Sequence, residues 1–454
     1  MKEELIQTEN REEEKTEQAP ATVPAETDGK LPLPGKAEWV LAALILAAAY
    51  IYYSCWMPVT WLRQKVVDQM GIGWQWLLFG FTCLFVAAGL IYARMKKQAV
   101  NRGSLIYLAL TGAAALWFVI YQPDDQPIMP YVFLFLSCVA VYWLTVLAGK
   151  QRGGCLDARA PGDLGRGLFY LPFAYFGRWW AALASLAGRL THSRQAHRDQ
   201  FRQALLGVLL SIPVLCIVLL LLVRADSSFA RAIDGLLPRL ANLFSVSGWL
   251  TAVLVVLIAM YLFGMFYGTF YEKRPEAEKR VRLPQAFLGG FLVMFVALYL
   301  IFFIIKLLAV PESLAQIAQG TLLTSTYARD GFFELCAIAF INFLIFSVIK
   351  WYSPDPGLLM KAALSILGVQ TLAFICLAFS KMGLYIDTYG LTFKRVFTSW
   401  FMAVLFLTFV LLVGEIWKKF NGVRIAVMTG AITFLILAYS NMPAWMAAYN
   451  AALH

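Results

Sequence analysis

Residues 286–308 read AFLGGFLVMFVALYLIFFIIKLL and contain a single charged residue, Lys306. A hydrocarbon core about 30 Å thick needs about 20 apolar residues in a crossing helix, so this stretch is long enough to span a membrane. Such stretches recur along the chain without the period-two alternation of a membrane barrel, so we predict an all-α, polytopic transmembrane helical bundle of about 11 spans. The spans are expected near residues 38–57, 74–93, 104–121, 129–148, 203–223, 248–270, 286–308, 331–349, 361–380, 396–413 and 423–440.

The composition of the 454 residues agrees with this prediction, because 60% are hydrophobic, 14% are charged and the mean hydropathy is +0.68. These values exclude a soluble enzyme. The net charge of +11 divides into −4 for residues 1–36 and +15 for the rest. Residues 1–36 are poor in aromatic side chains and contain prolines, so we expect a disordered acidic cytoplasmic tail.

The distribution of Lys and Arg between the loops predicts the orientation of the chain. With the N-terminus inside, the inner loops hold 23 bases, including Lys361 and Arg424 in the first two positions of the spans that follow, and the outer loops hold nine. Because basic loops are retained in the cytoplasm, we predict that the N-terminus lies inside and the C-terminus outside. The bases are not gathered on a soluble face with stacking aromatics, so we expect anionic lipid headgroups as partners and no nucleic acid.

The predicted spans form two groups separated by a basic connector. Residues 37–149 are expected to form a four-span N-terminal bundle, and residues 203–454 a seven-span C-terminal bundle. The cytoplasmic connector, 150–202, contains an apolar run at 168–188 that Pro172 and Arg178 interrupt. Because basic residues flank this run on both sides, we predict an interfacial amphipathic helix rather than a crossing, with the aromatic side chains Tyr170, Tyr175, Trp179 and Trp180 at headgroup depth.

The motifs of nucleotide, zinc and serine-hydrolase sites are absent from the sequence, so we expect no metal and no cofactor and favour a role without catalysis. The informative residues are charged groups close to span ends, because charge within a membrane is costly and usually faces a cavity or partner. Four segments place such groups on the predicted outer face of the C-terminal bundle. The candidate polar outer site comprises Asp226, Arg231, Lys306, Tyr327, Arg329, Asp330, Glu334, Lys381, Tyr385, Asp387 and Tyr389.

A structural interpretation of the same residues stays open. Asp330 and Glu334 would stabilise the start of a helix, and Lys306 would extend to the headgroups. If Lys306 or Lys381 lies near Glu334, the pair would instead neutralise each other inside the bundle. Three further polar or small residues are expected to have structural roles: Asn342 in an interhelical hydrogen bond, the Gly264/Gly268 pair in close helix packing, and Glu415 in an ion pair with Lys418 or Lys419.

Three of the outer segments resemble a family of bacterial polytopic membrane proteins defined as a domain of unknown function. They are Arg224–Arg231, Tyr327–Leu335, and Leu384–Thr392 followed by Arg395. The resemblance covers roughly residues 200–440 and implies a multi-pass protein of the bacterial cytoplasmic membrane. It implies no activity, cofactor or catalytic residue.

The sequence thus supports three hypotheses about function. The first is a transporter-like or conduit-like protein whose outer polar site binds a small solute or ion. The second is a membrane sensor, scaffold or envelope-assembly protein whose tail and connector bind a protein partner and lipid. The third is a lipid-modifying enzyme with its site beside Glu334.

Overall fold

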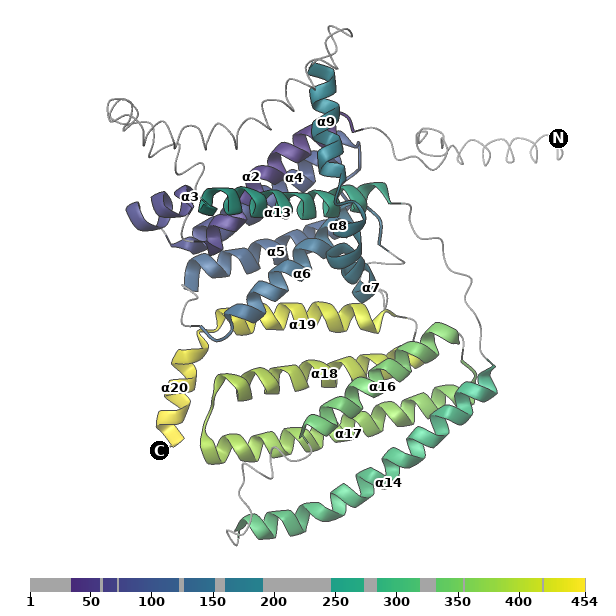
Figure 1. Ribbon diagram of the computed structural model, residues 1–454. Helices are drawn as coiled ribbons and strands as arrows, with labels where there is room; N and C mark the ends of the chain where they lie inside the picture. The colour runs from purple at the N-terminus through teal and green to yellow at the C-terminus, as the bar shows by residue number, and fades with distance from the viewer. Residues whose placement is uncertain are drawn as a thin grey trace, which may run out of the picture.

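The computed structural model describes residues 34–57, 60–71, 73–121, 126–151, 160–190, 246–272, 284–318, 332–353, 356–418 and 420–453. All regular structure in these ranges is helical, and nine of the described helices are long and apolar enough to cross a membrane. The helices run side by side, in Figure 1 mostly across the picture. The predicted all-helical, multi-pass class is therefore confirmed.

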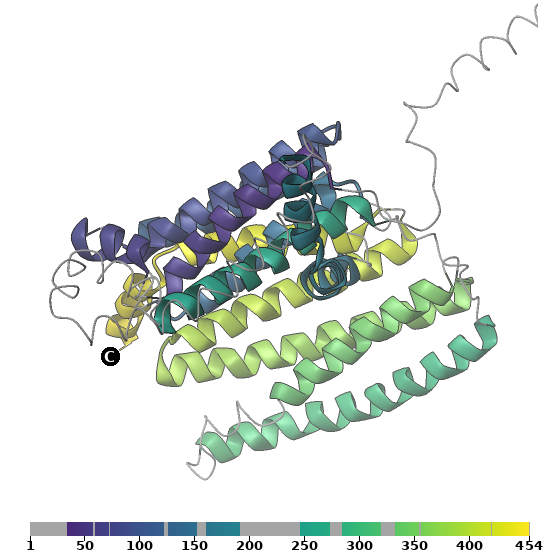
Figure 2. The same ribbon diagram turned by 45° about the horizontal axis from the view of Figure 1, so that its top comes forward.

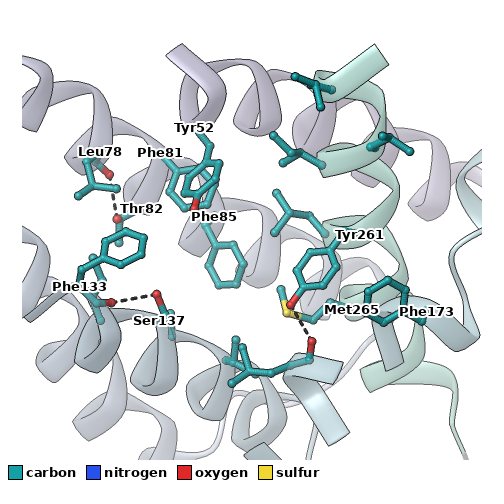
Figure 3. Close-up of a pocket in the computed structure, with 18 of the residues that line it drawn as sticks. Tyr52, Leu78, Phe81, Thr82, Phe85, Phe133, Ser137, Phe173, Tyr261 and Met265 are labelled. Atoms are coloured by element: carbon teal, nitrogen blue, oxygen red, sulfur yellow. Dashed lines mark hydrogen bonds between the residues drawn. The ribbon is translucent and has the colours of Figure 1, made fainter. Parts of the chain in front are cut away.

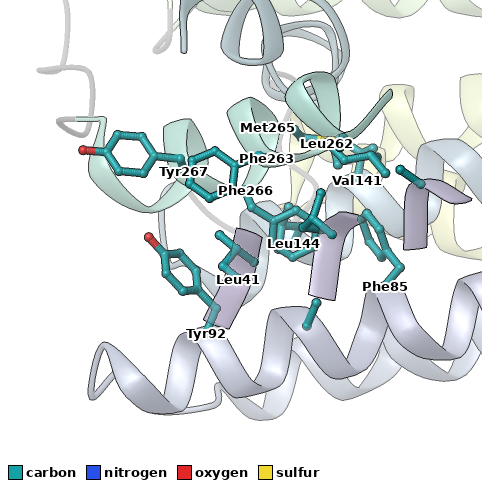
Figure 4. Packing of buried hydrophobic residues seen from close by; sticks show 14 of the residues in the cluster. Leu41, Phe85, Tyr92, Val141, Leu144, Leu262, Phe263, Met265, Phe266 and Tyr267 are labelled. Atoms are coloured by element: carbon teal, nitrogen blue, oxygen red, sulfur yellow. The ribbon is translucent and has the colours of Figure 1, made fainter. Parts of the chain in front are cut away.

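The first group of helices shares one core. It consists of α2 (Lys36–Trp56), α4 (Trp74–Met95), α6 (Met129–Leu147) and α13 (Val246–Tyr271). Along α2, Leu41, Ile45 and Ala49 recur at intervals of four residues, the spacing of one helix face, and each is at most 1% exposed. Figure 4 shows the side chains of the other three helices converging on this face.

Small residues let these helices approach closely. A Cβ atom on Gly89 of α4 would lie 2.7 Å from the ring of Trp143 in α6, and Trp143 is fully buried. Helix α13 belongs to the same core, although we predicted that it would lie in the C-terminal bundle. Its partners in this core explain the difference, because α13 contacts α2 along much of its length.

The second group consists of α14 (Gln285–Ala318), α16 (Phe332–Tyr352), α17 (Leu358–Tyr389) and α18 (Phe393–Trp417), packed around Phe374 and Phe409. Helix α14 lies at the far edge of the molecule in both Figure 1 and Figure 2. Its window of spanning length is 17% buried, so most of its side chains face outward, as expected for a helix surrounded by lipid.

Two helices connect the groups: α5 (Arg102–Tyr121) from the N-terminal half and α19 (Gly422–Tyr439) from the C-terminal half. Trp117 Nε1 donates a hydrogen bond to the carbonyl oxygen of Ala438 at 2.9 Å, and the Tyr439 hydroxyl donates to that of Ala113 at 2.7 Å. A short helix, α20 (Met442–Leu453), follows at the same end of the molecule as α3 (Trp61–Arg63) (Figure 1).

Nine of the predicted spans correspond to described helices of spanning length. The predicted span at 203–223 lies outside the described residues. The span at 331–349 corresponds to α16, whose apolar portion, Ala337–Lys350, is shorter than the usual spanning length. The predicted tail lies outside the described residues up to residue 33, and α2 begins at Lys36 within its last positions.

The connector does not form one continuous helix across the predicted run at 168–188. It contains α7 (Ala160–Gly165), the π-helix η3 (Arg166–Tyr170), α8 (Leu171–Ala174), a turn, and α9 (Arg178–Leu190). Pro172 lies in α8 and Arg178 begins α9, so the interruptions seen in the sequence coincide with changes of element. The predicted membrane depth of the connector stays a prediction.

Candidate functional site

A cavity of about 550 Å³ lies within the N-terminal group of helices (Figure 3). Its volume falls within the range of about 300–1,000 Å³ that is usual for small-molecule sites. Helices α2, α4, α6 and α13 contribute most of the wall, and the connector contributes the rest. The wall is apolar and aromatic, and includes Tyr52, Leu78, Phe81, Phe85, Phe133, Leu257, Ile258, Tyr261 and Met265.

Three hydroxyl groups in this wall donate to backbone carbonyl groups. Thr82 donates to Leu78 and Ser137 donates to Phe133, each at 2.9 Å, and the Tyr261 hydroxyl donates to Leu168 at 2.7 Å. Figure 3 shows these bonds along the wall. Because their hydrogens are already used, these groups do not offer donors to a bound molecule. The cavity is therefore suited to hydrocarbon.

The connector closes one end of the cavity, which we call the connector end. Leu168, Phe173 and Phe176 line the cavity there. A Cβ atom on Gly264 of α13 would lie 2.4 Å from the carbonyl oxygen of Pro172, and one on Gly268 would lie 2.6 Å from the Tyr175 ring. The predicted close packing at these glycines is confirmed, and the partner is the short helix α8 with the turn that follows it.

A buried ionic cluster lies at the same end of the bundle. Glu38, in the first turn of α2, is 2% exposed, and its Oε1 atom lies 2.6 Å from Lys96 Nζ. The hydroxyl groups of Tyr271 and Tyr92 donate to the same oxygen at 2.9 and 3.1 Å, and the backbone N–H of Gly35 donates to Oε2 at 2.7 Å. The cluster therefore joins the ends of α2, α4 and α13.

Two arginines of the connector extend this ionic region. Arg178 Nη2 donates to the Tyr267 hydroxyl at 3.1 Å, and Tyr267 stacks on Tyr271 with ring centroids 4.3 Å apart. Arg166 Nη2 lies 2.5 Å from Glu272 Oε1, just beyond the end of α13. Burial raises the pKa of the Tyr175 phenol, and the nearby Glu272 carboxylate raises that pKa further, so Tyr175 stays protonated at neutral pH.

The arrangement can bind an apolar chain and can hold fixed charges at one end of it. Among the described residues, no group of three or more His, Cys, Asp or Glu side chains is placed to hold a metal ion. The ionic cluster is internally paired among the described residues, and its contacts hold three helix ends together.

The third of the segments with family resemblance forms the turn between α17 and α18. Arg395 Nη1 donates to the carbonyl oxygens of Tyr389, at 2.8 Å, and Gly390, while its guanidinium lies 4.1 Å from the ring centroid of Tyr385. Asn450 of α20 holds the turn from outside, since its side chain accepts from the Leu391 N–H at 2.6 Å and donates to the Leu391 carbonyl at 2.9 Å.

A family model described as "Domain of unknown function (DUF4153)" matches residues 108–454, more than half of the chain. The chain belongs to the DUF4153 family. The match to DUF4153 begins within α5, further toward the N-terminus than the predicted 200–440, so it includes α6 as well. No curated protein and no solved structure matches the chain.

Most of the predicted outer site lies beyond what the structure describes. Lys306 and Glu334 lie in α14 and α16, but their side chains are outside the described part. The remaining residues outside it are Asp226, Arg231, Tyr327, Arg329 and Asp330.

Four members of the predicted outer site are described, and all lie in the last turns of α17: Lys381, Tyr385, Asp387 and Tyr389. Tyr385 and Tyr389 contact Arg395 as part of the helix turn, and the Asp387 side chain is exposed. A turn-forming role thus accounts for the two tyrosines. The convergence of four segments on one DUF4153 site stays a prediction.

The predicted hydrogen bond of Asn342 is confirmed, because its Nδ2 atom donates to Thr371 Oγ1 at 2.8 Å and joins α16 to α17. The predicted partner of Glu415 was wrong. Its Oε1 atom lies 2.5 Å from Lys350 Nζ, so Glu415 joins α18 to α16 rather than pairing along its own helix. Spacing within one helix gave no information about the neighbouring helix.

The sequence reasoning missed Glu38 and the aromatic wall of the cavity. Glu38 is an acid inside an apolar span, and that was the available signal. Its proximity to the tail hid this signal, because an acid in the first helical turn is also favoured by the helix dipole. The cavity depends on gaps between helices, and no periodicity along one helix reports such gaps.

Proposed function

We propose that this protein is a multi-pass protein of the bacterial cytoplasmic membrane that binds the hydrocarbon chain of a membrane amphiphile in the N-terminal cavity. The observation that carries the proposal is the apolar wall, whose hydroxyl groups at Thr82, Ser137 and Tyr261 donate to the backbone. Apart from the hydroxyl group of Tyr52, such a wall offers no side-chain donor to compensate the desolvation of an ion or a polar solute. A hydrocarbon chain loses no hydrogen bonds when it enters.

The length of the cavity supports the same ligand. Its wall on α13 extends from Leu254 to Met265. At a rise of 1.5 Å per residue this distance is about 16 Å. Leu254 lies 17 residues before Tyr271, the end of α13, or about 25 Å deeper. The cavity therefore crosses the middle of a hydrocarbon core about 30 Å thick and lies where lipid chains lie.

We retain the predicted orientation, with the N-terminus and the connector end on the cytoplasmic side. The excess of Lys and Arg in the predicted inner loops supports it. The connector end would then lie at the headgroups of the inner leaflet. Binding of a hydrocarbon chain is a step common to lipid transport, lipid sensing and lipid modification.

The predicted outer site for a small solute is a separate proposal with its own test. Glu334→Gln and Lys306→Met should reduce solute binding or flux in liposomes. If neither variant changes binding or flux for any screened solute, that proposal is wrong. The result would not affect the cavity, whose wall contains neither residue.

Mass spectrometry of the purified protein tests chain binding. We expect the wild-type protein to retain about one lipid per chain after detergent purification. Ala140→Phe should lower this number, because Ala140 lines the cavity. Ala297→Phe is the matched control, since Ala297 is exposed on α14. Ser137→Leu provides a second cavity variant with a smaller added volume.

Two results would overturn the proposal. One is equal lipid retention by the wild-type protein, both cavity variants and the control. The other is efficient chemical cross-linking of a Ser137→Cys variant to the native Cys216, which lies in the predicted span 203–223. That cross-link would show that the chain itself fills the cavity.

A further inference from the structure

The connector carries a cation beside the aromatic rim of the cavity. Arg166 lies two residues before Leu168, which lines the cavity, and its guanidinium lies 5.6 Å from the ring centroid of Tyr170. We propose that the amphiphile in the cavity is an anionic phospholipid, and that Arg166 and Tyr170 bind its headgroup. This inference rests on the proposed function, because it assigns the headgroup of a lipid whose chain lies in the cavity.

The depth of Arg166 fits a headgroup. Its partner, Glu272, directly follows Tyr271, the last residue of a helix of spanning length. The ion pair between them therefore lies where α13 leaves the hydrocarbon core. Met265, the cavity residue nearest this end of α13, lies six residues before Tyr271, or about 9 Å deeper.

Exposed aromatic side chains connect the headgroup position with the cavity. Phe169, Tyr170 and Phe173 are 69%, 57% and 65% exposed. Aromatic side chains are enriched at the boundary between headgroups and hydrocarbon. Phe173 also lines the cavity and packs edge-on against Tyr261, with ring centroids 5.9 Å apart, so one surface leads from Arg166 into the cavity.

Arg166 can bind an anion although it is already paired. Among the described residues, Lys96 is paired with Glu38 and Arg166 with Glu272. The contact with Glu272 uses the Nη2 nitrogen of Arg166. A guanidinium has five N–H donors, so it can bind a phosphate oxygen alongside Glu272. Arg166 is 26% exposed, so a headgroup can reach it.

Arg178 provides a matched control within the same connector. Its guanidinium binds Tyr267, and neither residue lines the cavity. It is also an arginine at the connector end, so its removal lowers the local positive charge by the same amount. A difference between Arg166 and Arg178 variants would therefore report headgroup contact rather than net charge.

The test is a competition in nanodiscs that contain equal amounts of phosphatidylglycerol and phosphatidylcholine. The lipid retained after detergent extraction is identified by mass spectrometry. We expect the wild-type protein to retain phosphatidylglycerol preferentially. A hydrogen bond to a charged group contributes about 1.5–3 kcal/mol, so Arg166→Gln should reduce this preference about tenfold or more.

Two further variants separate binding from charge repulsion. Glu272→Gln should increase the preference for phosphatidylglycerol, because it frees Arg166. In Arg166→Gln alone, the unpaired Glu272 carboxylate would repel an anionic headgroup. The double variant Arg166→Gln/Glu272→Gln removes this repulsion. It should still lose the preference for phosphatidylglycerol, because Arg166 is absent. Arg178→Gln should keep it.

The outcomes distinguish this inference from the proposed function. Loss of all retained lipid from the wild-type protein would contradict chain binding itself. Retention of lipid without a headgroup preference, or equal losses in the Arg166→Gln and Arg178→Gln variants, would overturn the headgroup assignment alone. Unchanged total lipid in Arg166→Gln, with an altered lipid composition, would support it.

Discussion

Glu38 is held by groups from three helices. Lys96 of the chain following α4 and the tyrosines of α4 and α13 converge on one carboxylate oxygen, and the side chain is 2% exposed. A buried carboxylate is stable when its hydrogen bonds and its charge are both satisfied. The cluster therefore fixes the connector ends of three helices relative to one another.

Glu38→Gln should destabilise the protein, because it removes the charge that Lys96 and two tyrosines compensate. We expect a loss of about 1–3 kcal/mol, the usual cost of leaving a buried polar partner unsatisfied. Lys96 is 27% exposed, so it can reach water and limit the cost. Thermal unfolding in detergent measures the effect.

Glu415→Gln is the control for this measurement, since Glu415 is 15% exposed, against 2% for Glu38, and its partner Lys350 is 44% exposed. An ion pair that water reaches contributes less than a buried one, so we expect a smaller loss of stability. The interpretation of Glu38 would be wrong if the two variants unfolded at the same temperature.

At the scale of single residues, the sequence predicted that a polar side chain in a span has a partner, but it did not identify the partner. Asn342 is polar in the middle of an apolar span, and that is sufficient to predict a hydrogen bond to a neighbouring helix. Glu415 shows the opposite case, because four-residue spacing favoured a lysine on its own helix while the true partner is Lys350. The identity of a partner depends on packing, which the linear pattern does not contain.

The turn between α17 and α18 depends on Gly390. Its φ of 72° and ψ of −174° describe a conformation that essentially only glycine adopts, and a Cβ atom would lie 2.5 Å from Asn450 Oδ1. Gly390→Ala should destabilise the protein by about 1–3 kcal/mol. The unfolding temperature should fall relative to the wild-type protein.

Gly383→Ala is the matched control on the same helix. A Cβ atom there would have no neighbour within 4 Å, and alanine favours a helix more than glycine by about 1 kcal/mol. This variant should unfold at the wild-type temperature or above it. A similar loss in both variants would refute the special role of the turn.

The connector is positioned by the small side chains of α13. Gly264→Ala would place a methyl group 2.4 Å from the Pro172 carbonyl oxygen, so α8 would have to shift away. We expect lower thermal stability and less lipid retained in the cavity, because Phe173 and Phe176 move with α8. Overpacking of this kind typically costs about 1–3 kcal/mol.

Gly289→Ala on α14 controls for the change in helix propensity, since a Cβ atom there would meet no atom within 4 Å. This variant should unfold at the wild-type temperature or above it, and its lipid retention should match that of the wild-type protein. If Gly264→Ala behaved in the same way, α8 would not be held by close packing on α13.

At the scale of helices, the sequence predicted the long helices and the close packing of α13, but not the short helices of the connector. The long helices follow from their apolar length, and the GxxxG spacing of Gly264 and Gly268 correctly indicated close packing. The division of the connector into short helices was not predicted, because a run of apolar residues at 168–188 gives the same periodicity whether or not it folds as one helix. Pro172 and Arg178 marked the interruptions without specifying the geometry.

For the whole molecule, the apolar stretches predicted the class but not the grouping of helices. Helix α13 follows a long connector, so sequence order placed it with the C-terminal half. In the structure it runs antiparallel to α2: Thr251 near its start contacts Tyr53 near the end of α2, while Tyr271 at its end contacts Glu38. Sequence proximity fails here because a long connector lets a helix return to the first bundle.

The positions of the helix ends also constrain the membrane topology. Ser185 of α9 accepts a hydrogen bond from Trp39 near the start of α2, whereas α13 starts near the end of α2. The chain therefore leaves the connector at one end of the bundle and begins α13 at the other. The predicted span at 203–223 would join these ends, which supports its inclusion in the count of eleven.

Cysteine labelling in intact cells tests the topology as a whole. In a background without the seven native cysteines, Met70→Cys and Leu453→Cys place a thiol at exposed positions near α3 and in α20, which lie at the same end of the molecule (Figure 1). Lys97→Cys lies at the opposite end, beside the ion pair of Lys96. An impermeant maleimide should label residues 70 and 453 from outside, and residue 97 after the membrane is opened. If residue 97 alone were labelled in intact cells, the true orientation would be the reverse of the predicted one. If residues 70 and 453 were labelled from opposite sides of the membrane, the predicted number of crossings would be wrong.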